Sequence, residues 1–278
     1  MTLDVFLRLG RVSNLPTVWT NALAGAVLAG SVAPGTLILI CIALSLFYVG
    51  GMWLNDAYDA EIDARERANR PIPMGEISRR RVFAGGFAML AAGVLIGALM
   101  GALLAGLCLA VAIILYDWLH KRTVLSPLLM GAARFFSYVF AASASGSVVF
   151  AVLLGAAGLF AYVVGLTYAA KKEAYNDLGN AWPLAVLALP VLVVLWMSGG
   201  SAAPLVILLG LLAVMGFALS RLFRRAPGDV PVAVVTLIAG IALYDAALIA
   251  AAGHLVLAGL AVAGFAATLV LQRVAAGT

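Results

Sequence analysis

The chain contains very little charge, and this scarcity excludes most soluble folds. Charged residues make up 10% of its 278 residues, whereas hydrophobic residues make up 65% and the mean hydropathy is +1.12. A soluble domain carries roughly 25% charged residues. The composition is typical of a polytopic membrane protein embedded in a lipid bilayer.

Cysteines and several common catalytic motifs are also scarce or absent. Cys41 and Cys108 are the two cysteines, and both lie in apolar runs, which excludes a disulfide framework or a cysteine metal site. The sequence has no P-loop, no Gly-x-Gly-x-x-Gly after a strand, no His-Glu-x-x-His and no Gly-x-Ser-x-Gly. It also has no apolar segment ahead of a cleavage site near the N-terminus. We therefore expect no cleaved signal peptide and a first span retained as a transmembrane helix.

What the sequence does contain is a series of apolar segments separated by Gly, Pro and charged residues. About 20 mostly apolar residues cross a bilayer as a helix. The sequence therefore predicts an all-α, polytopic transmembrane bundle of about nine or ten helices that forms one domain over residues 1–278. The segment at 182–198 is short, and either it or the last segment is an alternative candidate for a re-entrant helix. The predicted spans are 15–33, 37–55, 82–100, 102–119, 125–146, 149–170, 182–198, 202–221, 230–251 and 254–273.

The basic residues are distributed very unevenly between the two ends of these helices. All 17 Lys and Arg residues except Arg134 fall at the same end, and the connections at 32–35 and 198–201 on the other side carry no charge. Positive charge marks the cytoplasmic side of a membrane protein. We expect the charged loops to face the cytoplasm, in a bacterial inner or plasma membrane. The basic excess then orients the helices and contacts anionic lipid, so it does not indicate nucleic acid.

The most informative segment is acidic. Five of the 12 acidic residues fall within eleven positions, in what we predict to be a loop directly after the second span. On a helix, Asn55, Asp59 and Asp63 would project from one face, because they are four residues apart. Oxygen donors of this kind suit Mg²⁺, which is usually shared with phosphate oxygens. The alternative is a solvated cap that anchors the helix, but the spacing and the rigid turn at 69–75 favour a metal–diphosphate site.

A second acidic segment closes the sixth span and has a related pattern. Glu173 and Asp177 are four residues apart, as are Tyr168 and Lys172. An interfacial cap with aromatic and Lys anchors is the competing interpretation. The second acidic segment lies on the same side of the membrane as the first, and this position favours a shared site.

Two further groups of residues could carry chemistry. Lys121 and Arg122 follow the fourth span and could bind a diphosphate, or they could simply set the topology beside a Tyr/Trp belt. We expect His120, next to them, to be interfacial rather than a ligand. Within the spans, Arg134 and Asp245 are ionisable, which is costly unless they pair with each other or face a cavity.

These motifs resemble those of the UbiA superfamily of intramembrane aromatic prenyltransferases. The likeness rests on Asn55-Asp56-x-x-Asp59-x-x-x-Asp63 with the Asn69-Arg70-Pro71-Ile72-Pro73-x-Gly75 sequel, on Arg11-x-x-Asn14-x-Pro16 leading into Trp19 and Asn21, and on Tyr116 with Lys121. One departure is that Glu173-x-x-x-Asp177 stands where the family usually has Asp-x-x-x-Asp. A divergent branch of the family would explain that difference.

The resemblance implies Mg²⁺-dependent transfer of an isoprenyl group from a polyprenyl diphosphate to an aromatic or other small lipophilic acceptor, through an allylic carbocation. It implies that Asn55, Asp59 and Asp63 hold one Mg²⁺ and that Glu173 and Asp177 hold another, as the catalytic set. The implied substrate-binding residues are Asn21, Asp56, Arg70, Tyr116, Lys121, Arg122, Tyr168 and Lys172, and Tyr58 is a further candidate for contacting the acceptor.

Two other functions compete with this one. A CDP-alcohol phosphotransferase also uses Asp-rich helices with Mg²⁺, but it expects Asp-Gly shortly before Ala-Arg, whereas Asp59 is followed by Ala60. A non-enzymatic transporter would need ionisable residues deep in several spans, and Arg134 and Asp245 are the clear examples.

Overall fold

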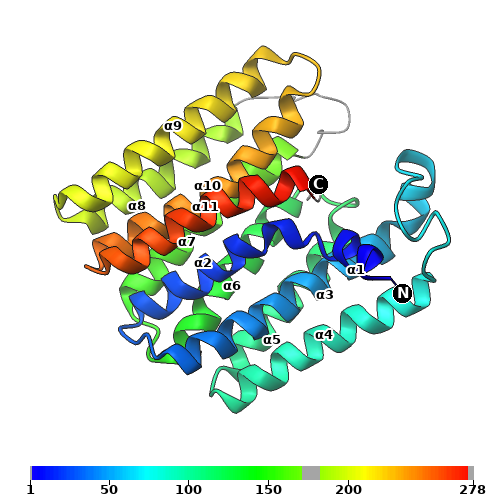
Figure 1. Cartoon of the computed structure of the whole chain (residues 1–278), viewed down its shortest axis with the longest axis horizontal. Coiled ribbons are helices and arrows are strands. Elements are labelled where there is room, and N and C mark those ends of the chain that lie inside the picture. The colour runs from blue at the N-terminus through cyan, green and yellow to red at the C-terminus, as the bar shows by residue number, and fades with distance from the viewer. Residues whose placement is uncertain (1, 171–181, 275–278) are drawn as a thin grey trace.

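The computed structural model describes residues 2–170 and 182–274, which form eleven α-helices and two 3₁₀ helices without a strand in these ranges. The elements are α1 (Leu3–Gly10), η1 (Val12–Asn14), α2 (Leu15–Leu28), α3 (Pro34–Glu66), α4 (Arg79–Leu99), α5 (Leu103–Leu119), α6 (Ser126–Ser145), α7 (Phe150–Ala170), η3 (Trp182–Leu187), α8 (Ala188–Ser198), α9 (Ala202–Arg224), α10 (Asp229–Ala251) and α11 (Leu255–Val274) (Figure 1).

The predicted all-α bundle is confirmed, and each of the ten predicted spans overlaps a helix, although the span at 182–198 is divided between η3 and α8. Seven described helices are long and apolar enough to cross a membrane by length and composition. The other three spans correspond to α2, α5 and α8, with 14, 17 and 11 residues. The fold is that of an integral, multi-pass membrane protein.

The second predicted span differs most from the structure. It was expected to end at 55, with an acidic loop after it, but α3 continues to Glu66 over 33 residues. Pro34 suits the first turn of the helix, since its missing N–H would have no partner there. The extension persists because its acidic side chains find partners on other elements. The first acidic motif is therefore helical, and the prediction of a loop was wrong.

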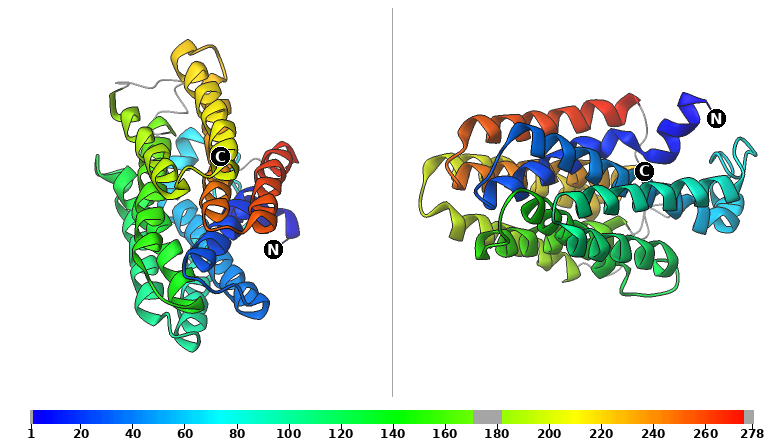
Figure 2. Two further views of the ribbon diagram at one scale, coloured as in Figure 1. Left: turned by 90° about the vertical axis from the view of Figure 1, so that its left-hand side faces the viewer. Right: turned by 90° about the horizontal axis from the view of Figure 1, so that it is seen from below.

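The helices pack as two groups that share α2 and α6. One hydrophobic core joins buried residues of α2 and α6 with α7, α8, α9 and α10, and the other joins them with α3, α4 and α5. Helix α10 lies at the centre of the first group and contacts α2, α7, α8, α9 and α11. The start of α1 and the end of α11 lie at the same end of the bundle (Figure 2). This arrangement leaves room for a cavity between the two groups.

Small residues let the helix backbones approach closely. A Cβ on Gly25 of α2 would lie 2.8 Å from the Ala141 Cβ and 2.9 Å from the Tyr138 carbonyl oxygen of α6. Likewise, a Cβ on Gly50 of α3 would lie 2.9 Å from the Gly86 carbonyl oxygen of α4. Packing of small residues drives association between membrane helices, because lipid tails are as apolar as the helix surfaces.

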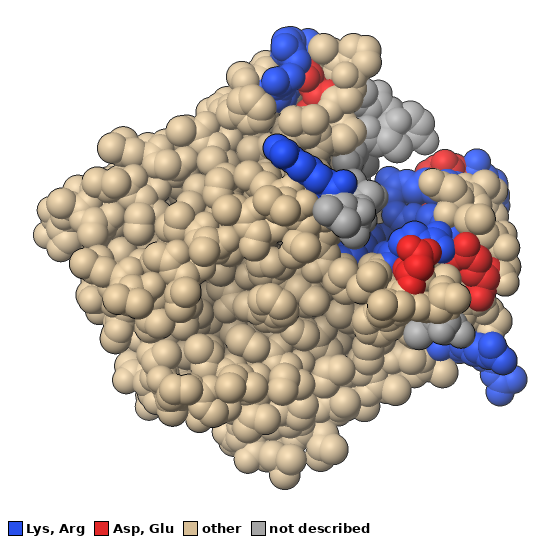
Figure 3. Space-filling model, viewed as in Figure 1, with Lys and Arg blue, Asp and Glu red and all other residues tan. Residues whose placement is uncertain are grey.

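The surface matches a membrane environment. Many large apolar side chains are exposed, among them Leu99, Leu104, Trp196 and Val206. In Figure 3, charged side chains gather at one end of the molecule, and the opposite end in this view shows none. We call the end that carries Arg70 and Lys121 the charged end.

Candidate active site

The site is built on the last turns of α3, at the charged end. Asn55, Asp59 and Asp63 follow one another at successive turns and line one cavity, as their spacing predicts. These side chains and Asp56 belong to residues that are only 4–7% exposed. Buried carboxylates need charged or hydrogen-bonding partners, and these come from distant parts of the chain.

Asp56 holds two arginines in place. The Arg11 Nη2 donates to Asp56 Oδ1 at 2.9 Å, and Arg70 Nη1 donates to the same oxygen. Arg70 Nη1 also lies 3.6 Å from Asp63 Oδ2. Asp56 itself does not line the cavity, whereas Arg11 and Arg70 do. The predicted substrate-binding residue Asp56 is therefore placed behind the two arginines.

The electrostatics of the two arginines differ. Burial opposes the charge of Arg11, but Asp56 leads the groups that raise its pKa above the ordinary value. Burial, followed by the positive charge of Arg11, lowers the pKa of Arg70 despite Asp56 and Asp63. Burial and the adjacent Arg11 therefore disfavour the charge of Arg70, and an anion in the cavity would favour it.

A second set of partners comes from the end of α5. Asn55 Nδ2 donates to Asp117 Oδ1 at 3.3 Å, while Arg11 Nη2 donates to Asn55 Oδ1 at 3.3 Å. His120 Nε2 lies 3.0 Å from Asp59 Oδ2, and its Nδ1 lies 3.1 Å from the Asp117 carbonyl oxygen. These contacts give Asn55 and Asp59 defined orientations.

His120, which was expected to be interfacial rather than a ligand, lies at the charged end in the cavity wall. Tyr116, a predicted substrate-binding residue, lines the cavity and stacks on the His120 ring at 5.1 Å. No local motif marks His120 or Asp117. The sequence signal available for these two residues was their position: they are polar and lie at the end of a span, on the same side of the membrane as the acidic motif.

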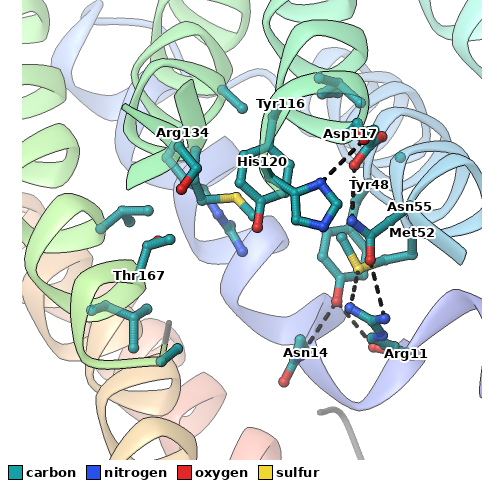
Figure 4. Close-up of a pocket in the computed structure, with 18 of the residues that line it drawn as sticks. Arg11, Asn14, Tyr48, Met52, Asn55, Tyr116, Asp117, His120, Arg134 and Thr167 are labelled. Carbon is teal, nitrogen blue, oxygen red and sulfur yellow. Dashed lines mark hydrogen bonds between the residues drawn. The ribbon is translucent and has the colours of Figure 1, made fainter. Parts of the chain in front are cut away.

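The cavity has a volume of about 620 Å³ and is lined from Glu66 and Arg122 at the charged end to Leu44 and Val18 inside the bundle. Figure 4 shows part of this lining. Lys121 and Arg122 line the cavity, as predicted for a diphosphate site. Its remaining wall is largely apolar. The apolar lining residues include Val18, Leu44, Phe47, Leu109, Ile113, Met130, Val163, Leu166, Val234, Ile238 and Ile241.

Deeper in the cavity, a polar network joins α6, α2 and α10. Arg134 lines the cavity and donates from Nη1 to Asn21 Oδ1 at 2.6 Å, and Asn21 Nδ2 donates to Asp245 Oδ2 at 2.8 Å. Both alternatives for Arg134 are thus realised in part, because it faces the cavity and reaches Asp245 through Asn21. Asn21 itself is fully buried and does not line the cavity.

The remaining predicted residues are placed elsewhere. Tyr168 packs against the core around α10 rather than lining the cavity. Tyr58 packs edge-on against Phe83 of α4 at 5.0 Å, also outside the cavity lining. Glu173, Asp177 and Lys172 lie outside the described residues.

The oxygen donors of α3 fit a hard divalent cation. Asn55, Asp59 and Asp63 supply oxygens, and Asp63 Oδ2 is buried without a hydrogen-bond partner. Within residues 2–170 and 182–274, no three His, Cys, Asp or Glu side chains converge on a ready-made metal site. Mg²⁺ characteristically takes one or two carboxylates and completes its shell with water and phosphate oxygens. The donor set therefore suits Mg²⁺ bound together with a phosphate ligand.

Fold and site together define an integral membrane protein whose helices enclose an acid- and arginine-lined cavity that continues into an apolar chamber. The chain belongs to the UbiA prenyltransferase family, whose sequence profile matches residues 16–229.

Individual relatives show partial similarity. The chain is 39% identical over 115 residues to a digeranylgeranylglyceryl phosphate synthase from Methanoculleus marisnigri, covering 41% of this chain and 39% of that protein. It is 37% identical over 139 residues to a protoheme IX farnesyltransferase from Bartonella quintana, covering 46% of this chain and 44% of that protein. Each match therefore spans less than half of the curated relative.

The fold similarity extends further along the chain. A UbiA homolog from Archaeoglobus fulgidus, solved bound to GPP and Mg²⁺, superimposes with a TM-score of 0.57 at 14% identity and covers 96% of this chain and 99% of that one. At this identity the likeness shows the shared fold.

Proposed function

We propose that the protein is a Mg²⁺-dependent prenyltransferase that transfers an isoprenyl group from a polyprenyl diphosphate to a small lipophilic acceptor, aromatic or otherwise. The observation that carries this proposal is the composition of the cavity. One end combines the Asn55, Asp59 and Asp63 face with Arg70, and the rest of the lining is largely apolar apart from Arg134 and a few neutral polar side chains. A polyprenyl diphosphate has the same division between a charged head and an apolar tail.

At the charged end, each residue has a role suited to a diphosphate. Asn55, Asp59 and Asp63 would hold Mg²⁺, which when bound neutralises diphosphate oxygens and stabilises the leaving group. Arg70, Lys121 and Arg122 line the same cavity and would bind the phosphate oxygens directly. We further propose that Glu173, Asp177 and Lys172 complete this site from the second acidic motif.

Ionisation of the allylic diphosphate leaves a carbocation that must be kept from water. The aromatic rings of Phe47, Tyr48 and Tyr116 line the cavity, and Tyr116 stacks on His120 beside Asp59 at the polar end. Aromatic faces stabilise a nearby cation, and the apolar wall excludes water. These residues would favour transfer to the acceptor over hydrolysis.

Family membership favours this function over the two alternatives, a CDP-alcohol phosphotransferase and a transporter. The UbiA homolog from Archaeoglobus fulgidus solved with GPP and Mg²⁺ supports the donor and the metal, and the two relatives named above support a prenylated product. The acceptors in those two names differ, so they do not identify the acceptor of this protein.

We also propose that residues 1–278 form one transmembrane domain whose charged end faces the cytoplasm of a bacterial inner or plasma membrane. The support is the clustering of basic residues at that end. A cytoplasmic opening would admit the charged diphosphate head group from that side of the membrane.

The test is prenyl transfer by membranes that contain the protein, incubated with Mg²⁺, prenyl diphosphates of several lengths and a panel of acceptors, with products identified by mass. Asp59→Ala and Asp63→Ala should each abolish product, because each removes a cavity-lining carboxylate. Glu61→Ala is the matched control, since Glu61 lies on the same helix with a 76% exposed side chain and pairs with Arg79. Full activity in both aspartate variants would overturn the proposal.

A further inference from the structure

Arg134 differs from the other basic residues of the cavity in its depth. Arg11, Arg67, Arg70, Lys121 and Arg122 also line the cavity, and all of them come from helix ends or loops at the charged end. Arg134 lies eight residues into α6, roughly 12 Å along the helix from its first residue. An ionisable residue at such a position in a membrane protein generally marks a functional site.

The depth separates Arg134 from the diphosphate site. Its guanidinium lies 5.9 Å from the centre of the Tyr48 ring. Tyr48 is two turns before Asn55 on α3, which corresponds to roughly 10 Å. Asp59 and Asp63 lie farther still along the helix. A diphosphate held by the Asn55–Asp63 face therefore binds at a different level of the cavity.

The hydrogen bonds of Arg134 to residues in the described ranges use only part of its donor capacity. Its guanidinium makes hydrogen bonds to Asn21 Oδ1 at 2.6 Å and to Thr17 Oγ1 at 3.4 Å, both neutral groups. An arginine has five N–H donors. Among the described residues, no carboxylate lies within ion-pair distance of it, and Asp245 is reached only through Asn21. Asn21 therefore lies between the positive charge of Arg134 and the carboxylate of Asp245, while the Arg134 side chain faces the cavity (Figure 4).

A purely structural role does not account for this arrangement. Asp245 already accepts hydrogen bonds from Asn21 and Tyr138. A cation placed only to neutralise Asp245 would contact it directly rather than line the cavity. The walls near Arg134 are otherwise neutral, with Met130, Ser137 and Thr167 as neighbours along the lining.

We propose that Arg134 binds an oxyanion of the acceptor substrate, a carboxylate or a phosphate, and thereby determines acceptor specificity. This inference rests on the proposed prenyl transfer and names the acceptor class for the same cavity. The guanidinium would hold the anionic group by charge-assisted hydrogen bonds, which are strong where water is excluded. The acceptor would then extend from Arg134 towards the charged end, where the diphosphate leaves.

The experiment measures binding to purified protein by equilibrium dialysis, so that it does not depend on turnover. The probes are hydroxybenzoate, hydroxynaphthoate and an alkylglycerol phosphate, each compared with its neutral amide or its dephosphorylated alcohol. Wild-type protein should prefer at least one anionic probe by about tenfold or more. Whether the favoured probe is a carboxylate or the phosphate identifies the source of the oxyanion.

Arg134→Gln should remove this preference, and Arg134→Lys should retain part of it because the charge remains. Arg80→Gln is the matched control, since Arg80 is exposed and lies outside the cavity lining. Binding of a non-hydrolysable prenyl diphosphate analogue with Mg²⁺ should be unchanged in all variants. In turnover, KM for the acceptor should rise while KM for the prenyl diphosphate stays the same.

The proposal is overturned if wild-type protein binds none of the anionic probes more tightly than its neutral analogue, a result that stands even if the glutamine variant does not fold. It is also overturned if Arg134→Gln weakens the diphosphate analogue and spares the acceptor preference. Failure of the proposed function is a different result: no prenylated product with any acceptor, whatever the binding preference.

Discussion

At the scale of single residues, the site depends on partner residues that hold the oxygens proposed to bind Mg²⁺. Asn55 illustrates this, because its amide could point either way without neighbours. Asp117 accepts from its Nδ2 at 3.3 Å, and so its Oδ1 is turned towards Arg11 and the cavity. An amide oxygen has two lone pairs, so one can accept from Arg11 and the other can bind Mg²⁺.

This geometry predicts that Asp117 is a positioning residue. Asp117→Leu should raise the Mg²⁺ concentration needed for half-maximal prenyl transfer by about 10- to 100-fold, the usual cost of losing a partner behind a metal ligand. Asp117→Asn should stay near wild type, because its amide oxygen can still accept from Asn55. A Mg²⁺ titration of both variants checks this. If the asparagine variant were as impaired as the leucine variant, the charge of Asp117 rather than its acceptor would matter.

The residues of the site were predictable from sequence only in part. The spacing of Asn55, Asp59 and Asp63 was sufficient to predict that their side chains share one face, because a helix places residues four apart on the same side. The partners of these residues were not predictable, since Asp117 and His120 are 62 and 61 residues from the groups they contact. Such contacts depend on how α3 and α5 pack, and a single sequence does not contain that information in a local pattern.

At the scale of whole elements, apolar runs predicted the helices well and their ends less well. Helix α3 passes the expected boundary because Arg11 and Arg70 offset the buried charge of Asp56. Helix α1 was not predicted at all. It has eight residues, is capped by Thr2, and ends where Arg11 adopts a left-handed conformation at φ 42°. Its length is below that at which an isolated helix is stable, so its packing against α3 supports it.

The packing of α2 on α6 gives a prediction about stability. Gly25→Ala should destabilise the protein by about 1–3 kcal/mol, because the new Cβ would meet backbone and Cβ atoms of α6 at 2.8–2.9 Å. Gly210→Ala is the matched control, since nothing lies within 4 Å of a Cβ there and alanine favours the helix. Unfolding in mixed detergent, followed by circular dichroism, checks both. Equal stability of the two variants would show that α2 and α6 can move apart at little cost.

At the scale of the whole molecule, the cavity between the two groups of helices has a charged end and a largely apolar interior. The charged end gathers carboxylates and arginines from α3, α5 and the connecting turns, and the interior is apolar except for the network around Arg134. The sequence predicted the two ends from charge alone. It did not predict the cavity, because that depends on which faces of α2 and α6 are shared between the two groups.

The orientation of the whole bundle gives the last prediction. Cys41 and Cys108 are the native cysteines, so a variant with both replaced by alanine provides a background for single labels. Met74→Cys places a thiol on an exposed position after α3, and Ser201→Cys places one on the exposed turn before α9. In intact bacterial cells, a membrane-impermeant maleimide should label position 201 and leave position 74 unlabelled.

In inverted membrane vesicles, the same reagent should label position 74 and leave position 201 unlabelled. The physical reason is that basic loops are retained on the cytoplasmic side while uncharged connections cross. Labelling of denatured protein at both positions is the control for thiol reactivity. The reverse pattern would place the cavity mouth on the outer side of the membrane. It would also separate the site from cytoplasmic diphosphates, and a different route for the donor would then be required.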